Sequence, residues 1–113
     1  MKILYAIFYT ENFERITKFY KEIVGLEVES LQGDSFVSFK LENGLLGIKT
    51  KVEEREIPGH QSLIVSVSNV EELYEQYKQR DVVWYKELTK QDWGTNFAIL
   101  DPDGNQLEFV QEA

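Results

Sequence analysis

The decapeptide NFERITKFYK at residues 12–21 recurs as NVEELYEQYK at residues 69–78, at a constant offset of 57 positions. Both copies begin with Asn, which is favoured at helix N-caps, and then place apolar residues three and four positions apart. This spacing predicts an amphipathic helix in each half of the chain. The residues expected to face the core are Phe13, Ile16, Phe19, Tyr20 and Ile23 in the first copy and Val70, Leu73 and Tyr77 in the second.

The segments around the two helices repeat as well. Before each helix the sequence alternates as a half-buried strand does, over residues 2–9 and 61–67. Three strand-like segments follow each helix, at residues 26–31, 35–41 and 45–51 and again at residues 82–88, 95–100 and 106–111. Asn43-Gly44 is expected to form the hairpin turn before the last strand of the first half. Each half therefore reads as strand, helix, strand, strand, strand.

This repeat predicts a single domain over residues 1–113, made of module one (1–52), a charged linker (53–60) and module two (61–113). One module alone would leave a face of its sheet uncovered, so the two modules are expected to pack together or against another chain. We expect helices on one face of the sheet and a cavity under the opposite, curved face.

Composition excludes several classes of function. Twenty acidic residues against twelve basic ones give a net charge of -8, which repels phosphate backbones and anionic membranes. Nucleic acid and membrane are therefore not expected as partners, and the charge serves either solubility or a preference for cationic or neutral ligands.

The chain contains no cysteine, which excludes disulfides, thiolate catalysis and zinc-thiolate sites, and it contains a single histidine, His60. No run of about 18 apolar residues is present, and the first residues read as a strand rather than a signal sequence. The expected location is the cytoplasm.

A tight turn and a strand, DPDGNQLEF at residues 101–109, close the second half. Pro at the second turn position fixes φ, and Gly closes the reversal. The alternation that follows places Leu107 and Phe109 on one face and Gln106, Glu108 and Val110 on the other. The Glu108 carboxylate is therefore expected at mid-strand on the face away from the core.

Two tandem βαβββ modules that end in Asp-Pro-Asp-Gly-Asn-x-x-Glu resemble the vicinal oxygen chelate superfamily, the group of glyoxalases, bleomycin-resistance proteins and extradiol dioxygenases. The resemblance covers the whole chain, through Phe19-Tyr20 and Val24-Gly25-Leu26 in module one and Trp93-Gly94 through Phe109 in module two. It implies an α+β fold in which two βαβββ modules form a curved mixed sheet, the glyoxalase/bleomycin-resistance fold.

Metal-dependent members of this superfamily take their ligands from the first and last strand of each module. The internal offsets place these four positions at Tyr5, Ile48, Ser62 and Glu108. Only Glu108 is a good ligand for a hard divalent metal, whereas a catalytic site normally needs about three such donors. We therefore predict no metal and no other cofactor, with a two-donor site of His60 and Glu108 as the weak alternative to an exposed His60.

Period-two alternation divides the first strands between the helix side and a ligand side. The helix side receives Leu4, Ala6, Phe8, Leu63, Val65 and Val67. The predicted ligand-binding residues are Tyr5, Ile7, Tyr9, Ile48, Ser62, Ile64, Trp93 and Glu108, with Ser66 on the same side. Trp93 precedes Gly94 at a strand entrance, as in drug-binding members of the family, while Trp84 serves either this pocket or packing in the core or a dimer interface.

The resemblance and this lining favour a small-molecule-binding protein of the bleomycin-resistance type, a homodimer that sequesters a ligand whose cationic or donor group pairs with Glu108. The alternative is a lyase, isomerase or dioxygenase in which Glu108 acts as the catalytic base or as a ligand of a divalent metal. A third class, an interaction protein without a ligand, would have its pocket filled by Tyr5 and Ile48. The simplest interpretation of Glu108 is an exposed charge on an edge strand.

Overall fold

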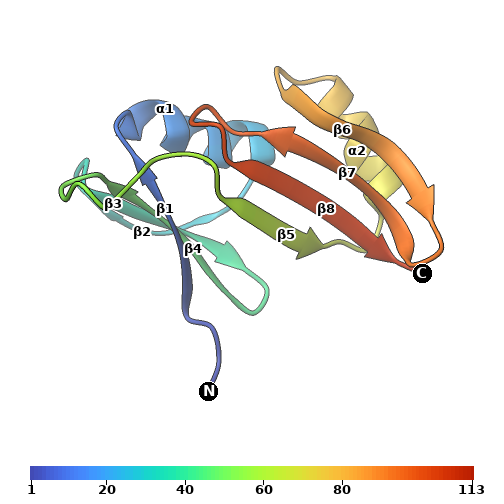
Figure 1. Cartoon of the computed structure of the whole chain (residues 1–113), viewed down its shortest axis with the longest axis horizontal. Helices are drawn as coiled ribbons and strands as arrows, with labels where there is room; N and C mark the ends of the chain where they lie inside the picture. The colour runs from blue at the N-terminus through green and yellow to red at the C-terminus, as the bar shows by residue number, and fades with distance from the viewer. The chain divides into compact units, whose positions relative to one another are not determined.

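The computed structural model describes every residue from Met1 to Ala113. The chain divides into two compact units, unit 1 (Met1–Gly59) and unit 2 (His60–Ala113). Each unit has one four-stranded mixed sheet and one helical segment, in the order strand, helix, strand, strand, strand (Figure 1). The predicted α+β class and the duplicated order of elements are confirmed.

Unit 1 consists of β1 (Tyr5–Thr10), α1 (Phe13–Lys18), η1 (Phe19–Val24), β2 (Val28–Gln32), β3 (Phe36–Leu41) and β4 (Gly44–Thr50). The strand order is β1-β4-β3-β2, with β1 parallel to β4 and the other pairs antiparallel. Parallel pairing of the first and last strands requires a crossover, which the helical segment provides.

The helical segment of unit 1 begins at a capped end and changes type midway. The side-chain oxygen of Asn12 accepts a hydrogen bond from the backbone N–H of Arg15 at 3.2 Å, as expected for an N-cap. From Phe19 onward the segment is a π-helix, η1, and it ends at Gly25, whose φ of 89° suits a residue without Cβ. The sequence predicted a single continuous helix here, because the spacing of apolar residues does not distinguish the wider turn of a π-helix from that of an α-helix.

The core of unit 1 lies between this helical segment and its sheet. Ile16 and Tyr20 are fully buried, and the Tyr20 ring lies 6.4 Å from Phe8 on β1 and 6.0 Å from Phe39 on β3. Ile48 on β4 is also fully buried and stands in register with Phe8. The helix therefore packs on the face that carries Phe8 and Ile48.

Unit 2 repeats the plan with β5 (Ser62–Ser66), α2 (Val70–Lys78), β6 (Val83–Gln91), β7 (Gly94–Leu100) and β8 (Gln106–Glu112). The strand order is β5-β8-β7-β6, with β5 parallel to β8. Figure 1 shows α2 against one face of this sheet. Asn69 caps α2 through a hydrogen bond of 3.1 Å from the backbone N–H of Glu72, matching Asn12 in unit 1.

Aromatic rings fill the core of unit 2 between α2 and the sheet. Phe97 on β7 and Phe109 on β8 are stacked with their centroids 5.0 Å apart, and Tyr77 of α2 lies 5.4 Å from Phe109. Trp84 lies 5.9 Å from Phe97 and 5.0 Å from Tyr74, so of its predicted roles the structure places it in the core. Burial raises the pKa of Tyr77 to about 12.

The loops between the last two strands differ in the two units. In unit 1 the turn is residues 42–43, and Gly44 already belongs to β4, so the predicted Asn43-Gly44 turn is shifted by one residue. In unit 2 the loop is residues 101–105, and Gly104 lies within it with a φ of 87°. None of the helices is long and apolar enough to cross a bilayer.

The segment expected to be a linker, residues 53–60, divides between the units: 53–59 belong to unit 1, and His60 begins unit 2. It has no helix or strand, but hydrogen bonds and an ion pair of Glu56 hold its backbone in place. Glu56 is 4% exposed, and its carboxylate accepts hydrogen bonds from the backbone N–H groups of Val52 and Glu53 at 2.8 and 3.0 Å. It also pairs with Lys49 of β4 at 2.7 Å, which ties the segment to the sheet.

Candidate functional site

The helix-free face of unit 2 is the face of its sheet that points away from α2. One row of side chains across it runs Ile64, Glu108, Ala98 and Lys86, because these residues are in register on β5, β8, β7 and β6. Leu107 and Phe109 point to the opposite face, where they are 2% and 4% exposed. The predicted placement of Glu108 at mid-strand away from the core is confirmed.

Glu108 is half-buried and has one neighbouring donor on its own strand. The side-chain amide of Gln106 donates to Glu108 Oε1 at 3.4 Å, a long hydrogen bond. A carboxylate oxygen accepts more than one hydrogen bond, so the group keeps acceptor capacity for a ligand. Its use as a catalytic base stays a prediction.

A polar network in the loop after β7 sets the position of β8. Asp101 Oδ1 accepts from the backbone N–H groups of Asp103 and Asn105, both at 2.9 Å, and Asp101 Oδ2 accepts from the Asn105 side-chain amide at 2.8 Å. Asn105 Oδ1 in turn accepts from the backbone N–H of Gln61, just before β5, at 3.1 Å. This DPDGN turn therefore joins the start of β8 to the start of β5, and the register that follows brings Ile64 beside Glu108.

Sequence reasoning missed Asn96, which lies on the same face. Asn96 is in register with Val110 on β8 and with Thr89 on β6, one row along from Glu108 and Ala98. It is 1% exposed, and its Oδ1 has no hydrogen-bond partner. No sequence signal distinguishes this Asn, because its importance lies in being buried and unsatisfied.

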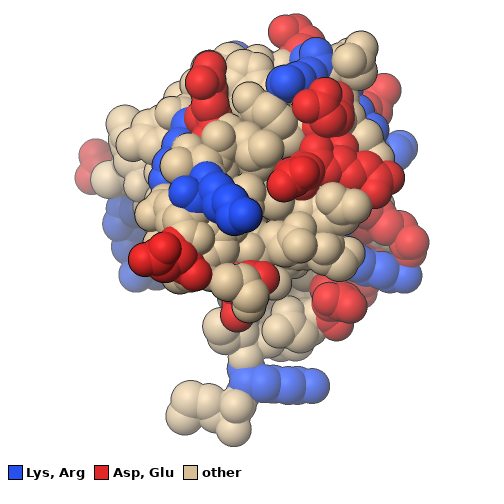
Figure 2. Space-filling view, turned by 90° about the vertical axis from the view of Figure 1, so that its right-hand side faces the viewer, with Lys and Arg blue, Asp and Glu red and all other residues tan.

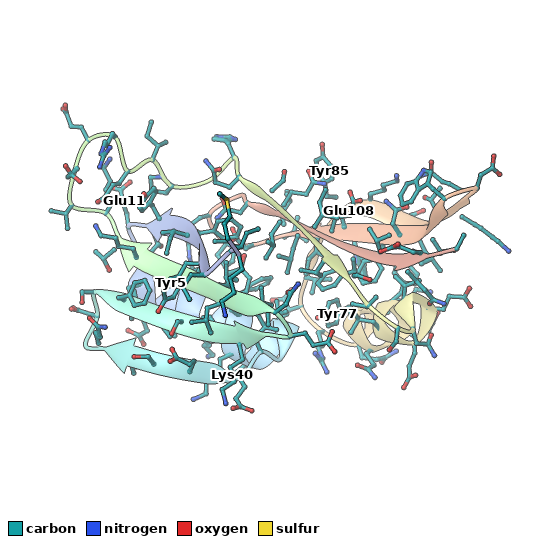
Figure 3. All side chains as sticks on the ribbon, turned by 90° about the horizontal axis from the view of Figure 1, so that it is seen from below. Tyr5, Glu11, Lys40, Tyr77, Tyr85 and Glu108 are labelled. Carbon is teal, nitrogen blue, oxygen red and sulfur yellow. The ribbon has the colours of Figure 1, made fainter.

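A register shift on β6 adds a ring to this face. The pairing of β6 with β7 is irregular between Trp84 and Lys86, so the intervening Tyr85 is displaced from the regular alternation. Figure 3 shows Tyr85 and Glu108 on the side of the sheet away from Tyr77. Tyr85 is 60% exposed, which leaves its ring accessible for stacking.

The equivalent irregularity in unit 1 lies between Val28 and Ser30 on β2. The intervening Glu29 accepts a hydrogen bond of 2.5 Å from the hydroxyl of Ser38, a buried residue in register with Gly47. Each unit therefore brings a carboxylate to its helix-free face, from β2 in unit 1 and from β8 in unit 2.

The helix-free face of unit 1 is more aromatic. Tyr5 and Phe36 meet edge to face with centroids 5.8 Å apart, and Ile7 shares the alternation of Tyr5 along β1. Tyr9 lies in register with Lys49, whose ammonium group is 6.0 Å from the Tyr9 ring centroid. Tyr5, Ile7 and Tyr9 therefore share one face, as the sequence predicted.

The expectation that Ile48 lines this face is wrong. Ile48 is in register with Phe8 and fully buried on the helix side, whereas Ile7 is in register with Gly47. In unit 2 the equivalent of Ile7 is Ile64, which pairs with Glu108. The counterpart of Glu108 is therefore Gly47, because a one-residue shift in a strand moves every side chain to the other face.

The residues at the four family ligand positions do not fit a divalent metal. With the correction they are Tyr5, Gly47, Ser62 and Glu108; the first and third are poor neutral ligands, and Gly47 has no side chain. Within neither unit do three or more His, Asp or Glu side chains gather as a metal site requires. His60 is exposed with a φ of 62° before β5 begins, in the turn that follows Pro58-Gly59.

Trp93 lies at the tip of the hairpin between β6 and β7. It is 49% exposed, and its indole N–H donates to Gln91 Oε1 at 3.1 Å. The next residue, Gly94, has a φ of 150°, and a Cβ there would come within 2.5 Å of the Gln111 carbonyl oxygen. The tip conformation thus requires glycine, and it holds Trp93 beside the end of β8, where Ala113 N–H bonds the Trp93 carbonyl at 3.1 Å.

Charge is unevenly distributed over the surface. On the face shown in Figure 2, acidic side chains gather into a contiguous band, whereas Lys and Arg are scattered.

Two charged groups of unit 1 have shifted pKa values. The hydrogen bond from Lys49, followed by those from the backbone of Glu53 and Val52, lowers the pKa of Glu56 to about 2. The hydrogen bond and charge of Glu27 raise the pKa of Lys40.

The sequence profile described as Glyoxalase/Bleomycin resistance protein/Dioxygenase superfamily matches residues 2–109. A comparison with functionally curated proteins found no match. Among solved structures, TnmS3, an antibiotic binding protein from Streptomyces sp. CB03234, is similar with a TM-score of 0.88 and 18% identity, over 100% of this chain and 97% of that chain.

Two further solved structures share the fold. A lactoylglutathione lyase from Agrobacterium tumefaciens has a TM-score of 0.79 and 17% identity, over 96% of this chain and 91% of that chain. TioX from Micromonospora sp. ML1 has a TM-score of 0.82 and 15% identity, over 100% of both chains. The predicted glyoxalase/bleomycin-resistance fold is therefore confirmed, and at these identities the likeness concerns the fold alone.

Proposed function

The chain belongs to the Glyoxalase/Bleomycin resistance protein/Dioxygenase superfamily, and from that premise we propose that it binds a small aromatic cation on the helix-free face of unit 2 and sequesters it without a divalent metal. Glu108 pairs with the charged or donor group of this ligand. Exposed rings and apolar side chains contact its flat body.

The observation that carries the proposal is the setting of Glu108. Its row neighbours on the adjacent strands, Ile64 and Ala98, are apolar, and its hydrogen-bond partner is the uncharged amide of Gln106. A half-buried carboxylate in such surroundings gains most from a cation whose apolar body also packs against the exposed side chain of Ile64. Lys86, in the same row beyond Ala98, is the one cation of that row.

The remaining charges favour the same class of ligand. A net charge of -8, with acidic residues gathered on one face, attracts small cations and repels anions over distances of about a Debye length (Figure 2). TnmS3, which shares the fold, is described as an antibiotic binding protein. Binding of a drug or metabolite is consistent with that fold.

We further propose that the functional form is a homodimer. Several large apolar side chains are more than a third exposed. This is more exposed apolar surface than single, scattered surface residues account for. These residues include Tyr5, Ile64, Val83, Tyr85 and Trp93. A second copy of the chain would cover part of this apolar surface and enclose the bound ligand.

A titration of two planar tricyclic probes of opposite charge tests the proposed function. The protein is titrated into 9-aminoacridine, a cation, and anthracene-9-carboxylate, an anion, and fluorescence polarisation is recorded at low and at high salt. We expect saturable binding of the cation that persists at high salt, because stacking is not screened, and no saturation with the anion. Equal binding of both probes, or binding of neither, would contradict the proposal.

A further inference from the structure

Asn43 is the one asparagine of the chain that glycine follows. It lies in the turn of two residues between β3 and β4, where it is exposed. No hydrogen bond or ion pair holds its side chain. An exposed and unrestrained side chain changes rotamer readily, so the amide carbon of Asn43 can approach the backbone nitrogen of Gly44.

The other four asparagines are restrained by their surroundings. Asn12 and Asn69 cap the two helices, and their side-chain oxygens accept hydrogen bonds from backbone N–H groups. Asn96 and Asn105 are 1% and 0% exposed. Each of these four precedes a larger residue, Phe, Val or Gln, whose side chain hinders access to the backbone nitrogen. Asn43 alone combines a free side chain with an unhindered neighbouring nitrogen.

Gly44 is the first residue of β4 and is paired with Leu41 across the turn. A Cβ on Gly44 would lie 3.5 Å from the carbonyl oxygen of Ile3 and 3.7 Å from that of Leu4, which is ordinary contact. The φ of Gly44 is not positive. The fold therefore tolerates a side chain at this position, in contrast to Gly47, and Gly44→Ala is a usable variant.

We infer that Asn43 is a site of spontaneous deamidation in the folded protein. The backbone nitrogen of Gly44 attacks Asn43 Cγ and closes a succinimide ring. The side-chain nitrogen leaves as ammonia and takes the proton that the Gly44 nitrogen loses. Water then adds to one of the two ring carbonyl carbons and opens the ring to aspartate or isoaspartate. Either product adds one negative charge to the net charge of -8.

The isoaspartate product inserts one extra carbon into the main chain of this short turn. Leu41 and Gly44 are paired across the turn, and the N–H of Leu45 donates to the Leu4 carbonyl oxygen at 3.1 Å. The extra carbon therefore disturbs the pairing of β4 with both β3 and β1. We expect the isoaspartate form to be less stable than the aspartate form, which keeps the normal main chain.

Incubation of the whole chain at mildly alkaline pH tests the inference, with Asn43→Gln and Gly44→Ala beside the wild type. Anion-exchange chromatography measures the added charge, and peptide mass spectrometry locates the gain of about 1 Da. We expect the wild type to accumulate an acidic form modified at Asn43 and Asn43→Gln to lack it. Gly44→Ala should form it several-fold more slowly, because the methyl group hinders ring closure.

Three results would each overturn the inference: no acidic form in the wild type, an equal amount of it in Asn43→Gln, or equal rates in the wild type and Gly44→Ala. Thermal unfolding is recorded first, and if Gly44→Ala is unfolded at the incubation temperature, the comparison with Asn43→Gln decides alone. Because no ligand is present, the outcome does not depend on binding at Glu108.

Asn43→Asp is the matched control for the effect on stability, since it carries the added charge without the extra carbon. The midpoint of urea unfolding should be the same for Asn43→Asp and the wild type and lower for the isolated isoaspartate form. An isoaspartate form as stable as Asn43→Asp would contradict the effect on strand pairing.

Discussion

Gly47 holds in unit 1 the position that Glu108 holds in unit 2. Each lies on the last strand of its sheet, in parallel register with an isoleucine of the first strand, Ile7 for Gly47 and Ile64 for Glu108. Even a Cβ at Gly47 would come within 2.7 Å of Ile7 Cδ1 and 2.9 Å of Phe36 Cζ. Side chains of unit 1 thus fill the space that a carboxylate fills in unit 2, and the carboxylate on the helix-free face of unit 1, Glu29, comes from β2 instead.

The Asn105 network predicts a large loss of stability on truncation. Asn105→Ala leaves the backbone N–H of Gln61 and one oxygen of Asp101 without their present partner, in a region where Asn105 is fully buried. We expect the free energy of unfolding to fall by about 2–4 kcal/mol. Urea denaturation measures it, with Asn43→Ala in the exposed turn of unit 1 as the control, expected within about 0.5 kcal/mol of the wild type. Equal effects of the two substitutions would contradict this role.

The Lys49–Glu56 pair predicts how the stability of unit 1 depends on pH. The hydrogen bond from Lys49 and those from the backbone of Glu53 and Val52 lower the pKa of Glu56 from 4.5 to about 2. Because the folded-state pKa is the lower one, the carboxylate stabilises the folded state fully above pH 4.5 and progressively less as the pH falls toward 2.

Urea unfolding of the wild type and of Glu56→Gln at a series of pH values measures this dependence. The variant should be less stable at neutral pH, and the difference in free energy of unfolding should shrink between pH 4.5 and pH 2. A difference that stays constant across this range would show that Glu56 acts through its shape and not through its charge.

The proposed homodimer predicts a molar mass in solution of twice the 13.2 kDa of one chain. Burial of exposed apolar side chains such as Tyr5 and Val83 is the driving force, so the dimer should persist at high salt, where ion pairs are screened. Size-exclusion chromatography with light scattering, run at several protein concentrations, measures the mass. A monomeric mass throughout would contradict the homodimer.

Much of the fold could be predicted because its signals are local and duplicated. The repeat that begins at Asn12 and Asn69 located both helices, and period-two alternation located the strands, each to within a few residues. The same alternation assigned Leu107 and Phe109 to the core and Glu108 to the other face, since that pattern depends only on neighbouring residues.

Features that depend on pairing between strands could not be predicted in the same way. The internal offset that led from Glu108 to Ile48 treats the turns before the two strands as equivalent. Gly44 is in a strand whereas Gly104 is in a loop, so the true counterpart is Gly47. The orphaned acceptor of Asn96 and the displaced Tyr85 likewise follow from burial and register shifts, which leave no trace in composition or spacing.

Isothermal titration of 9-aminoacridine into EDTA-treated protein, comparing the wild type with Glu108→Gln, tests the central claim most directly. Glu71→Gln, a substitution of an exposed carboxylate in the first turn of α2, is the matched control for net charge. We predict saturable binding to the wild type and to Glu71→Gln without metal, and binding about 10- to 100-fold weaker to Glu108→Gln, which loses a charge-assisted hydrogen bond. Equal affinity of Glu108→Gln and the wild type, or binding that appears only when a divalent metal is restored, would contradict the account.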